Sequence, residues 1–229
     1  MKDTKDPARY LLRWKAKNGV FEAYDRVEKE SKILGDKVPF VVLEEFISVR
    51  GVTPDKKPIY SNEIQDLRLE ELVVKVYGLE DGEKVEKTIL QGFWDEIRPA
   101  KETDSPEVKR KKQKTEYGQK YCKVIYCAFW DGEVKFGKME LTGMAVGGWI
   151  EFTNSTPGRP KGVLCDGGKS VSTPNGNFFA PNFVSREVSE DTMNKAAEFK
   201  AELYEYVKGK DAPAPAKAPE PMDDDEVPF

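Results

Sequence analysis

Apolar residues fall mostly into short dense runs along this chain. Residues 38–49 (VPFVVLEEFISV) carry β-branched and aromatic residues on both faces, which predicts a strand buried on two sides. Two further pairs of apolar runs are each joined through an Asp-Gly dipeptide, the usual sequence of a tight hairpin turn. These pairs predict β-hairpins over residues 72–93 and 121–141.

Helical patterns occur near both ends of the chain. Apolar residues at 10, 11 and 14, followed by Asn18-Gly19, predict a short helix within residues 6–19. Ser189 is a suitable helix N-cap, and the two acids after it complement a helix dipole. The apolar stripe of the helix that follows consists of Ala196, Phe199, Leu203 and Tyr206. This helix is expected to end near Gly209.

The remaining segments lack such regular patterns. Residues 98–118 combine charges and prolines and are expected to form a long loop. Residues 142–152 predict a helical turn and then a short strand, and residues 154–182, rich in Gly, Pro and Asn, are expected to be irregular. At least five strands in sequential hairpins, with one late helix, predict a mainly β chain folded as a small antiparallel barrel or sandwich with elaborations.

Composition narrows the class of protein. Among 229 residues, 34% are charged, and no window approaches the roughly 18 apolar residues of a membrane span, so a cytoplasmic location is expected. The chain has no histidine, which excludes His-based catalysis and ordinary Cys/His zinc sites. We expect no cofactor and no metal, and we expect Cys122, Cys127 and Cys165 to be packing residues.

Charge divides the chain into a neutral body and an acidic end. From Gly209 onward two lysines face six acids, so this segment alone carries the net charge of −4, and residues 1–208 are neutral. Alternating Ala and Pro over 209–221 predict a semi-rigid linker, and residues 222–229 (MDDDEVPF) form an acidic tip. The expected organisation is therefore a domain over 1–208, a linker over 209–221 and a tip over 222–229.

A basic segment lies inside the neutral body. Residues 109–123 hold seven cations and one acid and lead into an aromatic strand. Proteins that hold single-stranded nucleic acid combine a cationic groove with aromatic faces for base stacking. The candidate DNA-binding residues from this segment are Lys109, Arg110, Lys111, Lys112, Lys114, Tyr117, Lys120, Tyr121 and Lys123.

Three further aromatic candidates come from strand pairing and from strand ends. On a regular strand Tyr121 and Lys123 share one face, which is the likelier binding side because a lysine is costly to bury. Phe136 is a candidate from the partner strand, and Trp94 and Trp130 stand at strand ends, where a ring can stay half exposed.

Two other functions fit parts of the sequence. Asp95 or Asp131, with Glu133 and Lys135, weakly resembles the acid and E-x-K constellation of metal-dependent nucleases. An adaptor that carries the acidic tip without any affinity for DNA is the other alternative. The G-G-K-S stretch at 167–170 does not match a phosphate-binding loop, because the required upstream glycine is displaced by one position.

The final residues D-D-D-E-V-P-F resemble the acidic tip of bacterial single-stranded-DNA-binding proteins, which typically end Asp-Asp-Asp-Ile-Pro-Phe. Glu226 is interposed here, and Val227 stands in place of Ile. The body is similar to the divergent OB-fold single-stranded-DNA-binding proteins of tailed phages, on the stretches LTGMAVGGWIEF (141–152), NFFAPNF (177–183) and LYEYV (203–207).

This resemblance implies an OB-fold-like antiparallel β-barrel with elaborations and a C-terminal α-helix. It implies a non-enzymatic protein that binds and protects single-stranded DNA in replication, recombination or repair, in the host cytoplasm if phage-encoded. By the same resemblance, the tip recruits replication or recombination proteins, with the terminal ring and carboxylate docking in an apolar pocket lined by cations. The partner-binding residues would be Asp223, Asp224, Asp225, Glu226, Val227, Pro228 and Phe229.

Overall fold

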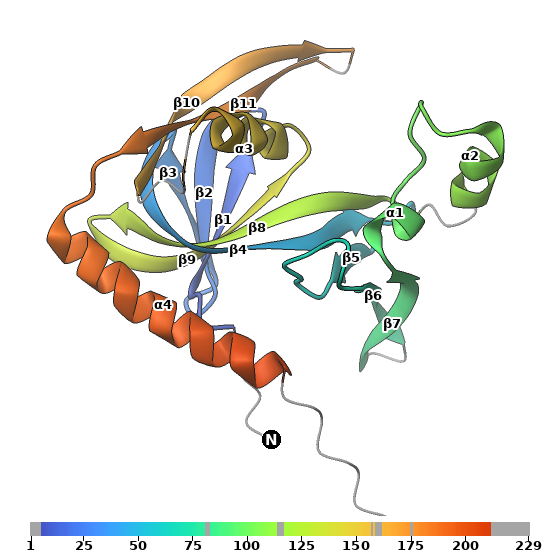
Figure 1. Ribbon diagram of the computed structural model, residues 1–229, viewed down its shortest axis with the longest axis horizontal. Coiled ribbons are helices and arrows are strands. Elements are labelled where there is room, and N and C mark those ends of the chain that lie inside the picture. Colours follow the sequence, from blue (N-terminus) through green and yellow to red (C-terminus); the bar gives the residue numbers. More distant parts are fainter. Residues whose placement is uncertain are drawn as a thin grey trace, which may run out of the picture.

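The computed structural model describes residues 6–80, 83–113, 117–156, 158, 162–174 and 176–211. Within them the chain is mainly β with a long C-terminal helix, as predicted (Figure 1). The strands are β1 (Tyr10–Lys15), β2 (Val20–Asp25), β3 (Glu30–Gly35), β4 (Lys37–Val52), β5 (Pro58–Ser61), β6 (Leu72–Glu80), β7 (Glu83–Gly92), β8 (Gln119–Asp131), β9 (Glu133–Thr142), β10 (Gly162–Thr173) and β11 (Gly176–Arg186). The helices are α1 (Trp94–Ile97), α2 (Pro106–Gln113), α3 (Met144–Ser155) and α4 (Glu190–Asp211).

All the strands belong to one sheet, and β4 organises it. β4 pairs with β8 along most of its length, with β10 at its beginning and with β5 at its end, and all three pairings are antiparallel. The order is β3-β2-β1-β9-β8-β4-β5-β6-β7, and the β10–β11 hairpin branches from β4. β1 runs parallel to β9, so the sheet is mixed. Strand pairing does not close it into a barrel, and the predicted fully antiparallel barrel is not observed.

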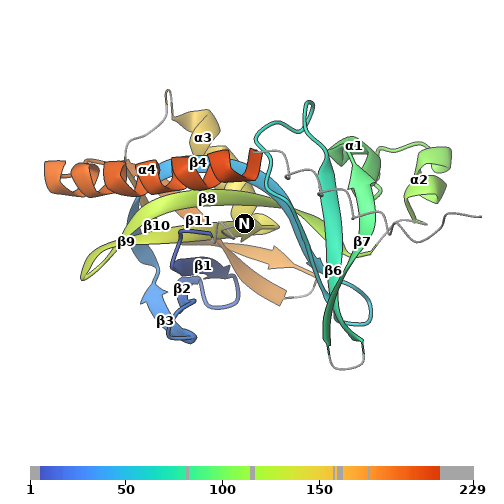
Figure 2. The same ribbon diagram turned by 90° about the horizontal axis from the view of Figure 1, so that it is seen from below.

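The two faces of β8 contact different layers of the molecule. Ile125, Cys127 and Phe129 face a core that also includes Trp149 of α3. The alternate residues of β8 face a second core, which α4 covers. Figure 2 shows α4 lying along the sheet formed by β4, β8 and β9. Side chains of a strand alternate between its faces, so the predicted parity of β8 is confirmed.

Residues 53–118, here called the arm, project from one end of β4 and β8 (Figure 1). The arm contains β5, β6, β7, α1 and α2, and its own small core packs on Ile47 and Val49 of β4. Where the arm joins the sheet, the two connecting backbones lie against each other. A Cβ at Gly51 would stand 2.1 Å from the carbonyl oxygen of Gly118, so only glycine fits there.

Several predicted elements are confirmed and others are wrong. The strand over 38–49 corresponds to β4, the hairpins to β6–β7 and β8–β9, and the late helix to α4. The helix predicted within 6–19 is wrong, because Tyr10–Lys15 pairs with both β2 and β9. The Asn18-Gly19 pair is the turn between β1 and β2, and both of its backbone amides donate to the carbonyl of Lys15.

Three other predictions failed between residues 98 and 182. The predicted loop over 98–118 contains helix α2. The predicted short strand ending at Phe152 is part of helix α3, whose buried residues Ala145, Val146, Trp149 and Phe152 follow helical spacing. The segment expected to be irregular forms the β10–β11 hairpin, with an irregularity in the register between Cys165 and Gly168.

All three cysteines are buried and free. Desolvation by burial raises the pKa of the Cys122 and Cys165 thiols to about 12. They are packing residues, as predicted. Within the described residues, no helix has the length and apolar character needed to cross a membrane.

Candidate nucleic-acid interface

A hollow of about 360 Å³ lies where the arm meets β8, and we call it the arm cleft. Trp94 enters it from the first turn of α1, which is fixed by the Phe93 amide donating to the Glu96 carboxylate (3.0 Å). Tyr121 enters from β8, and the two half-buried rings meet edge to face with their centroids 5.8 Å apart. Lys101, Lys120 and Val146 also line the cleft. Two of the predicted stacking residues therefore lie together.

Lys112 joins helix α2 to helix α1 within the arm. Its ammonium donates to the backbone carbonyls of Asp95, Glu96 (3.2 Å) and Arg98 (3.4 Å), the last of which directly follows α1. The side chain is buried, and desolvation together with the nearby Arg98 charge lowers its pKa. Lys112 therefore stabilises the arm, and its predicted role as a phosphate ligand is wrong.

Arg98 is also a structural cation. It forms a two-point pair with Asp104, with nitrogen–oxygen distances of 2.7 and 2.8 Å. Hydrogen bonds from Arg98 hold the pKa of Asp104 well below its usual range. Asp104 in turn accepts from the backbone amide of Lys101 (2.8 Å), which fixes the loop that carries Lys101 at the edge of the cleft.

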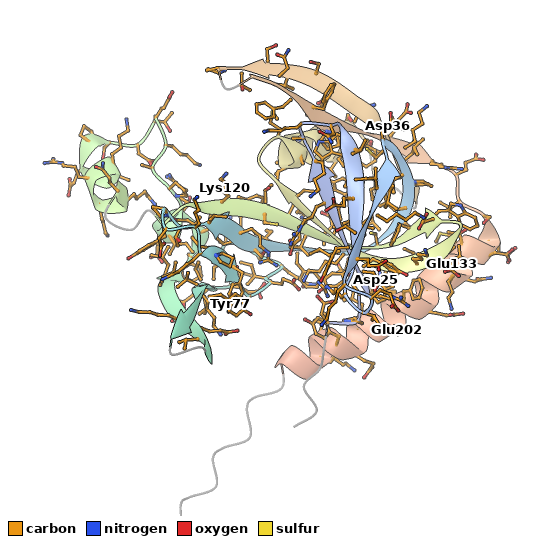
Figure 3. The ribbon with its side chains drawn as sticks, turned by 180° about the vertical axis from the view of Figure 1, so that it is seen from behind. Asp25, Asp36, Tyr77, Lys120, Glu133 and Glu202 are labelled. Carbon is orange, nitrogen blue, oxygen red and sulfur yellow. The ribbon has the colours of Figure 1, made fainter. Side chains whose placement is uncertain are left out.

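Lys101 and Lys120 at the arm cleft are exposed, as are Lys109, Arg110 and Lys111 of α2. Within the described part of the chain, no ion pair involves Lys101, Lys109, Arg110, Lys111 or Lys120. Figure 3 labels Lys120 at the end of β8, next to the arm. Elsewhere cations commonly face a carboxylate, as Lys32 faces Asp131 at 2.6 Å. Lys101 and Lys120 therefore bring unpaired positive charge to the two aromatic rings, in a chain whose body is neutral overall.

A second hollow, the helix groove, continues from the arm cleft. The two share Tyr121 and Val146, and the helix groove has a volume of about 570 Å³ between α3 and α4 over β4. Its walls are mostly apolar and include Val42, Trp149, Ile150 and Met193. Lys123 lies in it and pairs with Glu45 at 2.7 Å, and the Trp149 indole N–H also donates to Glu45 (3.3 Å). Lys200 of α4 lines it as well.

Two predicted aromatic candidates lie elsewhere. Phe136 is 5% exposed and stacks on Phe199 of α4 at 5.0 Å, so its predicted contact with DNA is wrong. It stands opposite Ala128 on the face of the sheet that α4 covers. Trp130 is 52% exposed, but it lines a separate hollow beside Arg186 at the far end of β8.

The remaining candidates have simpler positions. Tyr117 is half-buried and packs on the core of the arm. Lys114 lies outside the described residues, as do residues 222–229 of the acidic tip. The face of β8 that carries Lys123 is mostly core, and only its end at Tyr121 and Lys123 opens into the two hollows.

One more hollow contains cations that sequence analysis did not single out. It measures about 460 Å³ and is lined by Arg13, Trp14 and Arg50, with Glu140 among them. Arg50 pairs with Glu140 at 2.8 Å, and Arg13 approaches the same carboxylate at 3.7 Å. The Trp14 indole N–H donates to the carbonyl of Phe179 (2.7 Å). These groups satisfy one another, so this hollow lacks the unpaired charge of the arm cleft.

Of the constellation that resembled a nuclease, only Asp131, Glu133 and Lys135 lie together, at the β8–β9 turn. Asp131 pairs with Lys32 and with Lys135 (3.0 Å), while Asp95 lies in α1 on the arm. Among the described residues, no group of three or more Cys, Asp or Glu side chains could hold a metal ion.

Comparison of the chain with protein families, with curated proteins and with solved structures finds no match to any of them. The functional argument therefore depends on the geometry of the arm cleft and the helix groove.

Proposed function

We propose that this protein binds and protects single-stranded DNA without requiring a particular sequence, and that it acts in DNA replication, recombination or repair. It acts in the cytoplasm, which is the cytoplasm of the host cell if a phage encodes the protein. The strand lies in the arm cleft and continues along the helix groove. No catalytic step is assigned to the protein.

The observation that carries the proposal is the combination of ring and charge in the arm cleft. Trp94 and Tyr121 offer partly exposed aromatic rings, and Lys101 and Lys120 beside them have no carboxylate partner in the described chain. Stacking of a base on such a ring is worth about 1 to 3 kcal/mol, and it is tolerant of sequence because every base has a flat face. The unpaired ammonium groups are suited to the phosphates between the bases.

The topology supports an open OB-like unit as the scaffold. Apart from the arm, which is inserted between β4 and β8, the strands β4, β8, β9, β10 and β11 follow in this order, with α3 between β9 and β10. β4 pairs with both β8 and β10. In OB folds, the second and third strands and the connections between strands 1–2 and 4–5 bind oligonucleotides. In this chain, the connection between the first and second strands of that unit is the arm.

The first test compares two tryptophans. Labelled oligo-dT should bind and duplex of the same length should not compete, which fluorescence anisotropy measures directly. Trp94→Leu should weaken binding about tenfold, because one base loses its stacking partner. Trp130→Leu is the matched control and should stay within about twofold, because Trp130 lies outside both hollows.

The outcome that would sink this proposal is equal affinity for oligo-dT and duplex, or equal loss from the two tryptophan variants. Thermal unfolding of each variant separates a stacking effect from loss of fold. Incubation with Mg²⁺, followed by electrophoresis of the oligonucleotide, separates binding from cleavage, because the protein is expected to leave the strand intact.

The acidic tip is proposed to recruit replication or recombination proteins. Phe229 supplies an apolar ring, and Asp223, Asp224, Asp225 and Glu226 add a steering field. Deleting residues 222–229 should abolish partner recruitment, measured by pull-down from host extract, and should leave or strengthen DNA binding. Weaker DNA binding after this deletion would contradict the division of roles.

A further inference from the structure

The helix groove has a polar floor that is held in a fixed geometry. Glu45 is about one-fifth exposed, and its Oε2 accepts from Lys123 (2.7 Å) and from the Trp149 indole (3.3 Å). Within the described residues, Oε1 of Glu45 has no hydrogen-bond donor. A carboxylate oxygen without a donor, at the floor of an apolar groove, is an acceptor available to a ligand.

Trp149 keeps this carboxylate in place. The indole is 2% exposed and touches the rings of Phe40, Phe152 and Phe183 at centroid distances of 5.1 to 6.1 Å. Because the ring is packed on several sides, its N–H points at Glu45 without freedom to turn away. The acceptor on Glu45 and the donor on Lys123 are therefore presented side by side.

The walls of the groove suit a flat ring. Val42, Ile150 and Met193 contribute apolar surface, and Ile150 is 48% exposed at the rim. A base entering between such walls presents its edge to Glu45 and Lys123. Carboxylates accept from the exocyclic amino group of cytosine, and ammonium groups donate to ring or carbonyl acceptors. Thymine places a carbonyl oxygen where cytosine places its amino group.

We propose that the helix groove is a nucleobase subsite that prefers bases with an exocyclic amino group, and cytosine in particular over thymine. This inference rests on the proposed function, because the groove receives its base from the strand held in the adjoining arm cleft. Glu45 reads the amino group and Lys123 the neighbouring acceptor, so a modest base preference is superimposed on sequence-tolerant binding.

The test uses the full chain with labelled oligo-dC and oligo-dT of about 20 nucleotides, a length that spans one such domain. Both are pyrimidine strands, so differences in base stacking within the strand are small. The wild-type protein should bind oligo-dC about fivefold more tightly than oligo-dT at the same salt concentration. Glu45→Gln should bring this ratio to about one, because the amide no longer offers two acceptor oxygens.

Glu151→Gln is the matched control for charge. Glu151 is an exposed carboxylate on the same helix as Trp149, it pairs with Lys169, and it does not line the groove. Its removal changes the net charge equally, so it should raise both affinities alike and keep the ratio. If Glu45→Gln fails to fold, Ile150→Trp fills the groove from its exposed rim and should abolish the preference in the same way.

The outcomes separate the two proposals. Equal affinity of the wild-type protein for both oligonucleotides, or a preference that survives in both Glu45→Gln and Ile150→Trp, overturns the base subsite and leaves single-stranded-DNA binding intact. Failure to bind either oligonucleotide overturns the proposed function itself.

Discussion

A tyrosine of β8 lies close to a lysine at two places along the strand, and the two places differ in what surrounds these residues. Past the middle of the strand, Tyr126 is fully buried and stands opposite Lys138 of β9. Its hydroxyl donates to Glu63 (3.0 Å), and Lys138 pairs with Glu63 and with Asp6 (3.0 Å). At the N-terminal end, Lys120 is exposed and Tyr121 is half-buried. Figure 3 labels Lys120 and Glu133 at opposite ends of the β8–β9 hairpin.

The difference arises from residues that are distant in sequence. Asp6 precedes the sheet and Glu63 belongs to the arm, and together they neutralise a lysine that would otherwise be buried without a partner. No such carboxylates reach Lys120 in the described chain. A lysine beside a tyrosine therefore does not by itself indicate nucleic-acid binding. The lysine is available to a phosphate only where no carboxylate of the protein pairs with it.

The largest effect is expected from Phe136→Ala at the covered end. The ring is buried under α4, so its loss should lower the free energy of unfolding by about 3 to 5 kcal/mol, measured by urea unfolding. Phe136→Leu keeps most of the volume and should cost about 1.5 kcal/mol or less. The DNA affinity of Phe136→Leu should match that of the wild type, and a large loss would reinstate Phe136 as a DNA contact.

A smaller effect is expected from two neighbouring lysines of α2. Lys112→Gln leaves the carbonyls at the end of α1 without their donor, and should destabilise the arm by about 1 to 3 kcal/mol. Lys111→Gln should leave stability within about 0.5 kcal/mol, because Lys111 is exposed. Limited proteolysis within residues 53–118 provides the readout. Equal protease sensitivity of the two variants would contradict the structural role of Lys112.

A third prediction concerns the exposed lysines of the arm and of the adjoining end of β8. Replacing Lys101, Lys111 and Lys120 together by Gln should lower affinity for oligo-dT about tenfold and reduce the log–log salt slope by about 0.7 per lost phosphate contact. Replacing the exposed Lys17, Lys29 and Lys208 removes the same charge away from both hollows, and is expected to change the slope little. Titrations at several salt concentrations measure both variants, and identical slopes would remove the arm cleft from the interface.

The last prediction tests whether the backbone of β8 opens locally in the native protein. Cys122 and Cys127 lie on opposite faces of β8, and burial raises the pKa of both thiols far above the value of about 8.5 expected in an unfolded chain. The folded state holds these protons as the pH rises past about 9, so the free energy of unfolding should fall from there toward pH 12. At pH 8, a colorimetric thiol reagent should react only after denaturation, whereas rapid reaction of the native protein would place an opening motion in β8.

The elements that could be predicted from sequence are those with strong local signals. Dense β-branched residues identified β4, and Asp-Gly turns identified two hairpins. β1 was mistaken for a helix because its strand character depends on pairing with β9, more than 100 residues away. α2 had a usable signal that was overlooked: Ser105 accepts from the Val108 amide (3.3 Å) and Pro106 occupies the first helical position.

The residues of the candidate site also divide into those that a local sequence pattern indicates and those that only the fold brings together. Lys120, Tyr121 and Lys123 could be identified because they are neighbours on one strand, and Trp94 because it ends a hairpin. Glu45, Trp149 and Lys200 come from β4, α3 and α4, and only the packing of these elements brings them together. The structural role of Lys112 could not be anticipated either, since it depends on backbone carbonyls in and just after a different helix.

The close approach of Gly51 and Gly118 has a consequence for how such a molecule can diversify. Gly51 is the direct ladder neighbour of Gln119, so the arm leaves and re-enters the sheet at a single point. A two-residue turn at this point could replace the whole excursion and keep every pairing between β4 and β8. Such a replacement would also take Glu63 away from Lys138 and uncover Ile47 and Val49. The arm is therefore a single insertion whose sequence can diversify only as long as these contacts with the frame are kept.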